Sequence, residues 1–61
     1  MSQKYEDHLY AASMHEEAGR LNEAIACLRL ARKYTTDHME LVHLSLWQER
    51  LEREKGQLPL P

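Results

Sequence analysis

Residues 15–31 read HEEAGRLNEAIACLRLA, and this stretch decides how the chain folds. On both sides of Gly19 the apolar residues recur every three or four positions, which is the period of an amphipathic α-helix. A glycine directly after such a segment is typical of a helix end, because glycine adopts the left-handed conformation without a steric penalty. The stretch therefore predicts two helices that are joined at Gly19 and Arg20 and folded against each other as a hairpin.

Working outward from that turn, the same periodicity predicts a helix over about residues 3–18 and a second over about residues 21–34. Leaving histidine aside, the first segment carries one basic and four acidic side chains, and the second, with Arg20, carries four basic and one acidic. Opposite net charges favour antiparallel pairing, although each exposed ion pair contributes only about 0–1 kcal/mol. Burial of apolar side chains must therefore decide the geometry of the hairpin.

A third helix is predicted over about residues 38–55, because Asp37 and Glu40 have the spacing of an N-terminal capping box. When each residue advances by 100°, its apolar side chains spread over an arc of roughly 220°, whereas one core contact uses about 100°. Four of them are expected to cover the hairpin: Leu41, Leu44, Trp47 and Leu51. Three more remain on an adjacent side: Met39, Val42 and Leu46. This helix therefore has more apolar surface than a single hairpin can cover.

Together the segments predict an all-α fold, an antiparallel helical hairpin plus a third helix, in a single helical domain over residues 1–56. Residues 57–61 contain two prolines and are expected to form an extended or disordered tail. A chain of 61 residues with a single cysteine has no internal disulfide, and its Cys and His residues lack the spacing of a zinc site. Its stability must come from packing, which we expect to include another chain.

The composition argues against several classes of function. Eight basic and ten acidic side chains give a net charge of −2, which disfavours nucleic acid and anionic membranes as partners. The N-terminal residues are too acidic for a signal peptide, and no apolar run is long enough to span a membrane. We therefore expect a cytoplasmic protein that binds neither nucleic acid nor a membrane.

The reactive side chains also lack the pattern of a catalytic or metal site. His8 and His15 are two helical turns apart, roughly 10 Å along the axis, which is too far to share one ion without another ligand between them. Cys27 lies on the apolar stripe of its helix and is interpreted as a small buried residue. A chain this short offers little concave volume for catalysis. We expect no enzyme activity, no catalytic residue, no metal and no cofactor.

The central stretch resembles the tetratricopeptide repeat, a 34-residue helical hairpin that stacks into protein-binding superhelices. The resemblance covers about residues 5–38, a single repeat, and leaves the third helix in the place of a capping helix. It rests on six residues at the small, turn and bulky positions of the repeat: Ala12, Gly19, Leu21, Ala24, Leu28 and Ala31. Four residues depart from the usual choices, mostly in the first helix: His8, Ala11, His15 and Thr36. The resemblance implies that the six matching residues are structural.

The resemblance also implies a protein–protein interaction module: an adaptor, a chaperone or an assembly subunit that works as a homo-oligomer or in a complex with a client protein. The ligand groove of the family is lined by first helices, which makes Leu9, Glu16 and Glu17 candidate partner-binding residues. Since Glu16 and Glu17 are adjacent, they point to different faces and are interpreted as solvated or partner-facing charges. From the third helix, four residues complete the candidate surface: Met39, Val42, Leu46 and Trp47.

Trp47 is the best single anchor for a partner, because tryptophan is enriched at interface hot spots, and it is equally a candidate core residue. Two alternatives remain open. The chain resembles the microtubule-interacting-and-transport domain, which has a similar hairpin and third helix and would bind a helical peptide. A regulatory nucleic-acid binder would use the short basic cluster of Arg29, Arg32 and Lys33, against which the net charge argues.

Overall fold

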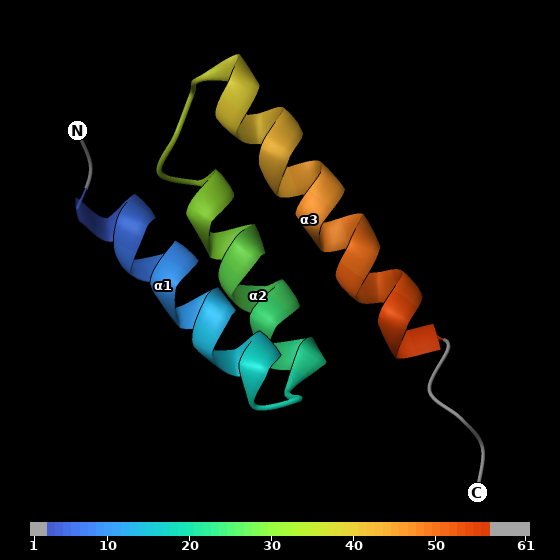
Figure 1. Ribbon diagram of the computed structural model, residues 1–61. Helices are drawn as coiled ribbons and strands as arrows, with labels where there is room; N and C mark the ends of the chain where they lie inside the picture. Colours follow the sequence, from blue (N-terminus) through green and yellow to red (C-terminus); the bar gives the residue numbers. More distant parts are fainter. Residues whose placement is uncertain (1–2, 57–61) are drawn as a thin grey trace, which may run out of the picture.

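The computed structural model describes residues 3–56 of the chain and contains three α-helices within them (Figure 1). Helix α1 spans Gln3–Glu17, α2 spans Leu21–Arg32 and α3 spans His38–Gly56. The chain runs up and down, so that α1 and α2 form an antiparallel hairpin and α3 lies on the far side of α2 from α1 in this view. The all-α fold with a hairpin and a third helix is confirmed. The predicted tail over residues 57–61 lies outside the described residues.

Gly19 ends α1 in the way that its sequence position predicts. Its φ is +81°, in the left-handed region that favours glycine. The amide of Gly19 donates to the carbonyl of Glu16 at 3.0 Å, and the amide of Arg20 donates to the carbonyl of His15 at 2.8 Å. These two bonds form a Schellman motif, which satisfies carbonyls that the end of a helix otherwise leaves free. The chain reverses over residues 18–20, and α2 follows directly.

The helix ends differ from the expected ones by one or two residues, and the hydrogen bonds show the reason at the end of α2. The amides of Lys33 and Tyr34 donate to the carbonyls of Leu30 and Ala31, three residues back, each at 3.0 Å. This tighter spacing is that of a 3₁₀ turn, which commonly closes an α-helix. The α-helix therefore ends at Arg32, two residues before the end expected at 34.

The start of α3 uses a modified form of the predicted capping box. The amide of Glu40 donates to Oδ1 of Asp37 at 3.1 Å, which is the N-cap bond of the box. The amide of Asp37 donates to the hydroxyl of Thr35 at 3.2 Å instead of to Glu40. The Thr35 hydroxyl in turn donates to the Glu40 carboxylate. In a standard capping box the Glu40 carboxylate would accept directly from the Asp37 amide, and here the Thr35 hydroxyl lies between the two groups. The spacing of Asp37 and Glu40 did not predict this part of the box.

Helix α2 lies at the centre of the core and packs against both other helices. The buried residues come from all three helices: Tyr5, Ala12, Ala24, Ile25, Leu28, Ala31, Leu44 and Leu51. Ala12, Ala24 and Ala31 are completely buried, and their small side chains let helices approach closely. Half-buried Leu9, Leu21, Cys27 and Trp47 pack around this centre. The core is thus built from alanines where helices touch and from leucines that fill the remaining space.

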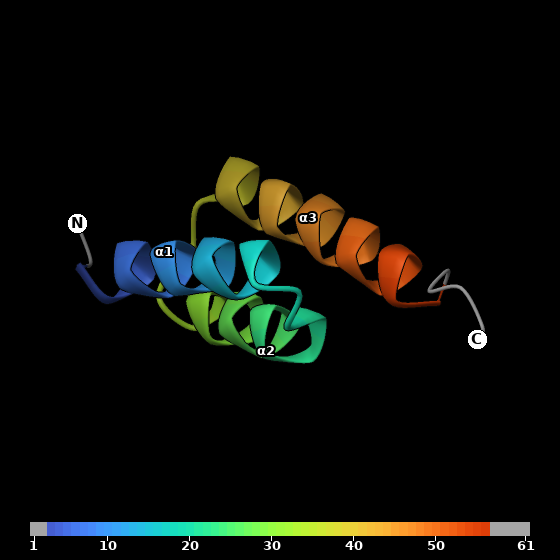
Figure 2. The same cartoon turned by 60° about the horizontal axis from the view of Figure 1, so that its bottom comes forward.

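Helices α1 and α3 have no direct backbone contact. Among the described residues, no Cα atom of α1 lies within 8 Å of a Cα atom of α3, whereas both helices meet α2 at that distance. The view in Figure 2 shows α1 and α3 above α2, with α3 crossing the hairpin at an angle. Only long side chains can therefore connect α1 to α3. Within the described part of the chain, no helix is both long enough and apolar enough to cross a membrane.

Candidate interaction surface

Three large apolar side chains lie exposed on the outer face of α3. Met39 is 73% exposed, Val42 is 40% exposed and Leu46 is 61% exposed. Their spacing of three and four residues places them along one side of the helix, opposite the buried Leu44 and Leu51. We call these three residues the α3 stripe. They are the three apolar residues of the third helix that were predicted from the sequence not to cover the hairpin.

A shallow cavity of about 420 Å³ lies beside the α3 stripe and is lined by His43, Leu46, Trp47 and Arg50. We call it the α3 hollow. Its four lining residues occupy positions n, n+3, n+4 and n+7 of one helix, the diamond of neighbouring side chains on a helix surface. The rings of His43 and Trp47 stack on one side, with their centroids 5.9 Å apart. The hollow is therefore lined by one aliphatic side chain, two stacked aromatic rings and one guanidinium group.

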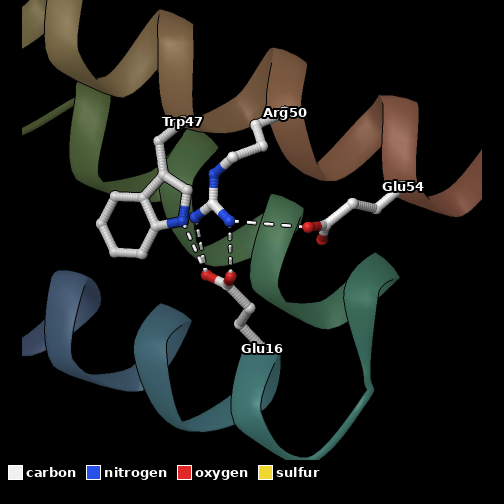
Figure 3. Close-up of polar contacts among 4 residues, drawn as sticks. All are labelled: Glu16, Trp47, Arg50 and Glu54. Carbon is white, nitrogen blue, oxygen red and sulfur yellow. Dashed lines mark hydrogen bonds and ion pairs between the residues drawn. The ribbon is translucent and has the colours of Figure 1, made fainter.

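A carboxylate from α1 fixes two of these lining residues (Figure 3). The indole Nε1 of Trp47 donates to Oε1 of Glu16 at 2.9 Å. The Arg50 guanidinium meets the same carboxylate through two nitrogens, with Nη1 at 3.0 Å from Oε2 and Nη2 at 3.3 Å from Oε1. Nη1 of Arg50 also lies 3.6 Å from Oε1 of Glu54. Glu16 thus joins the end of α1 to the middle of α3.

The charge state of Glu16 follows from these contacts. Burial alone raises the pKa of its carboxyl, since its side chain is only 24% exposed. The hydrogen bonds from Trp47 and Arg50, together with the positive charge of Arg50, outweigh burial and hold the pKa below its ordinary value. The carboxylate is therefore ionised and fully engaged within the molecule.

Glu16 accordingly differs from its interpretation as a solvated or partner-facing charge. Of the two adjacent carboxylates, only Glu17 is exposed, on the opposite side of α1 from the core. Leu9 is half-buried and packs against the core. Arg50 was not predicted from the sequence to have this role. The only signal was its spacing of four residues from Glu54, which concerns α3 alone.

A second exposed surface lies on the outer face of α1. Tyr10 is 70% exposed and Met14 is 49% exposed. Three exposed carboxylates flank them: Glu6, Asp7 and Glu17. We call these five residues the α1 stripe. Tyr10 and Met14 were not predicted as surface candidates, although their spacing of four residues on the helix face opposite Ala12 indicates a shared exposed face.

Two histidines and the cysteine of the described residues have contacts or surroundings within the molecule that account for them. His8 stacks on Tyr34 with ring centroids 5.4 Å apart, and Nδ1 of His15 lies 3.2 Å from the Glu23 carboxylate. Burial, with the nearby charge of Glu23, raises the pKa of the Cys27 thiol, which keeps it from the reactive thiolate form. In the described residues no three His, Cys, Asp or Glu side chains converge on a position for a metal ion.

No protein-family model, no curated protein and no solved structure matches this chain. The resemblance to the tetratricopeptide repeat therefore rests on the residues of this chain alone. Of the six residues that carry it, Ala12, Ala24, Leu28 and Ala31 are completely buried, Leu21 is half-buried and Gly19 forms the turn. The features of the molecule that bear on its function are the exposed surfaces of α1 and α3.

Proposed function

We propose that this protein is a protein–protein interaction module, a small cytoplasmic adaptor, chaperone or assembly subunit similar to a tetratricopeptide repeat, and that it binds through the α3 stripe. One observation carries the proposal. In a chain of 61 residues, three large apolar side chains lie exposed in a row beside the α3 hollow. Contiguous exposed apolar surface of this kind marks interaction sites in soluble proteins.

The rigidity of the α3 hollow also supports the proposal. Trp47 is held by its hydrogen bond to Glu16, and Arg50 is held by two contacts to the same carboxylate. Side chains that are already fixed lose less conformational entropy when a partner binds, so more of the contact energy appears as affinity. Tryptophan and arginine are also the residues that most often dominate binding energy at interfaces.

Site-specific photo-crosslinking of the full chain tests this proposal. A photoreactive amino acid at Leu46 is expected to crosslink a discrete protein species in cells, whereas the same amino acid at Glu52 is not. Both positions are exposed on α3, but Glu52 lies away from the α3 stripe, so it serves as the matched control. Adding Met39→Ser and Val42→Ser is expected to abolish the crosslink from position 46.

Met39 and Val42 are better targets than Trp47 for this purpose. Removing Trp47 also removes its hydrogen bond to Glu16 and disturbs the contact between α1 and α3, so lost binding would be confounded with lost structure. Met39 and Val42 are exposed and make no such contact among the described residues. Position 46 crosslinking no protein, or crosslinking the same species as position 52, would contradict the proposed function.

A further inference from the structure

We propose that the α1 stripe binds a basic amphipathic helix of another protein. This surface is separate from the α3 stripe, so the inference goes beyond the proposed function and does not depend on it. In Figure 1 α1 is one of the two outer helices, and in that view no other helix covers its side away from α2. The apolar and acidic side chains on that side determine the chemistry of the partner.

The centre of the α1 stripe is apolar. Tyr10 is 70% exposed, far more than Tyr34 at 38%, and Met14 is 49% exposed. Their spacing of four residues places Tyr10 and Met14 on neighbouring turns of α1, so their side chains form one patch. Tyrosine and methionine are both enriched in protein interfaces. The centre of the stripe therefore offers contact surface to apolar side chains of a partner.

Both ends of the α1 stripe are acidic. Glu6 and Asp7 lie one turn before Tyr10, and Glu17 lies one turn after Met14. Within the part of the chain that the structure describes, these three carboxylates make no hydrogen bond and no ion pair. The negative charges at both ends of the patch are therefore available to a partner.

Three other carboxylates of the chain, by contrast, have basic partners within it. Glu16 and Glu54 each form an ion pair with Arg50. Glu23 lies 3.1 Å from Nε of Arg20. The absence of such pairing distinguishes the α1 stripe from the acidic residues that connect parts of the fold.

No basic side chain of α1 neutralises the stripe. Helix α1 contains one lysine and no arginine, and Nζ of that residue, Lys4, lies over the ring of Tyr34, 5.7 Å from its centroid. His8 stacks on the same ring, and His15 lies against Glu23. The α1 stripe thus carries negative charge alone, and a partner with positive charges complements it.

The spacing of the charges indicates that this partner is a helix. Glu6 and Glu17 are eleven residues apart, which is about 16 Å along a helix. A second helix that packs alongside α1 presents its side chains at the same intervals of three and four residues. A lysine or arginine at each end of an apolar face three turns long therefore meets a carboxylate at each end of the α1 stripe. The charges steer the partner, and the apolar centre holds it.

A second copy of this chain does not have that pattern within residues 3–56. On the exposed side of α2, Arg29 and Lys33 lie near one end of the helix, and Glu23 lies near the other. On α3, Arg50 lies beyond one end of the α3 stripe, beside the exposed Glu49. Neither helix presents basic side chains at both ends of an apolar face, so the partner is another protein.

A designed helical peptide tests the inference in solution. One face of the peptide carries leucines at its centre and lysines at both ends, and its binding to the full chain is followed by fluorescence anisotropy of a dye on the peptide. Two matched peptides serve as controls: in one the lysines are replaced by glutamates, and in the other the leucines are replaced by serines. Only the peptide with both leucines and lysines is expected to bind. Its affinity is expected to fall as salt is added, because salt screens exposed charges.

Paired variants of the chain locate the binding surface. Tyr10→Ala and Glu17→Lys are each expected to weaken binding of the peptide by about tenfold, because each alters the α1 stripe. Leu46→Ala and Glu49→Lys are the matched exchanges on α3 and are expected to bind the peptide as the wild type does. All four positions are exposed, so circular dichroism is expected to show unchanged helicity.

Several results would overturn this assignment of the α1 stripe. One is a Tyr10→Ala variant that binds the peptide as the wild type does, and another is weaker binding by Leu46→Ala, which would place the peptide on α3. Equal binding of the peptide with serines would show attraction by charge alone. Self-association of the wild type in sedimentation equilibrium that Tyr10→Ala abolishes would make a second copy the occupant. None of these results bears on the crosslink from position 46, so the proposed function is tested separately.

Discussion

The Glu16 carboxylate lies 31 residues from Trp47 in the chain, yet it accepts a hydrogen bond from the indole and two contacts from Arg50. Hydrogen bonds to a charged group are the stronger kind, and here they join two helices whose backbones do not touch. One side chain therefore connects α3 to the end of α1.

Replacing Glu16 with glutamine is expected to lower the free energy of unfolding by about 1–2 kcal/mol, because the charge that Trp47 and Arg50 stabilise is removed. The pKa of Glu16 in the folded state lies below its ordinary value of 4.5, so its contribution is fully present above pH 4.5 and is lost as the pH falls through the folded-state pKa. Chemical denaturation followed by Trp47 fluorescence measures both effects. The difference in free energy of unfolding between the wild type and Glu16→Gln is expected to become smaller as the pH falls. A difference that is independent of pH would contradict this role of Glu16.

Gly19 allows a second test with a matched control in the same chain. A Cβ atom at Gly19 would meet no atom within 4 Å, so Gly19→Ala costs only the backbone strain of φ +81°, about 1–2 kcal/mol. Gly56 is equally open but has no positive φ, so Gly56→Ala is expected to be neutral or slightly stabilising. Thermal unfolding of the two variants checks this difference. Equal stability would mean that the turn at Gly19 has another conformation.

At the scale of the elements, α3 contains a half-buried polar side chain whose hydrogen bonds are incomplete. Gln48 is half-buried, and its Oε1 atom has no hydrogen-bond partner among the described residues, while its Nε2 atom donates to Glu52 at a long 3.4 Å. A buried acceptor without a partner costs free energy. Gln48 is therefore a position in α3 at which the wild-type side chain lowers the stability of the fold.

Gln48→Met is expected to raise the free energy of unfolding by about 1 kcal/mol, because it keeps a flexible chain of similar length and removes the unpaired oxygen. Urea denaturation measures the change, and Gln48→Glu serves as the opposite control, since it places a charge at the same site. A Gln48→Met variant less stable than the wild type would indicate that the amide has a partner in solution.

Much of the element structure could be predicted from the sequence because its signals are local. Gly19 and Asp37 mark helix ends through their own backbone and side-chain bonds, and helical spacing identifies Leu28 and Leu44 as buried. The contact of Glu16 with Trp47 and Arg50 could not be predicted in this way. Periodicity tells which face of a helix is apolar, but the angle at which α3 crosses the hairpin decides which distant side chains meet.

At the scale of the whole molecule, the chain keeps two exposed stripes on its outer helices and a small core between them. Large exposed apolar side chains in so short a chain leave much of the possible burial to association. If copies associate through an exposed stripe, the folded state is stabilised by mass action as well as by its own core. Stability is then a property of the assembly.

The melting temperature of the wild-type chain is therefore expected to rise with protein concentration, whereas that of Leu46→Glu, which places a charge in the α3 stripe, is expected to stay constant. Differential scanning calorimetry over a wide range of concentrations measures this dependence. Ala26→Glu, at an exposed position of α2, is the matched control and is expected to behave like the wild type. A wild-type melting temperature that ignores concentration would contradict self-association.

The attachment of α3 to a single neighbouring helix has a consequence for local unfolding. Helix α2 is covered from two sides, but α3 packs on α2 alone and reaches α1 only through the side chains around Glu16. Amide hydrogens of α2 are therefore expected to exchange with deuterium most slowly, and those of α3 sooner, through openings that leave the hairpin folded. A neighbour docked on α3 would slow that exchange, so deuterium uptake at Leu44 and Leu51 would report occupancy of a surface on the opposite side of the same helix.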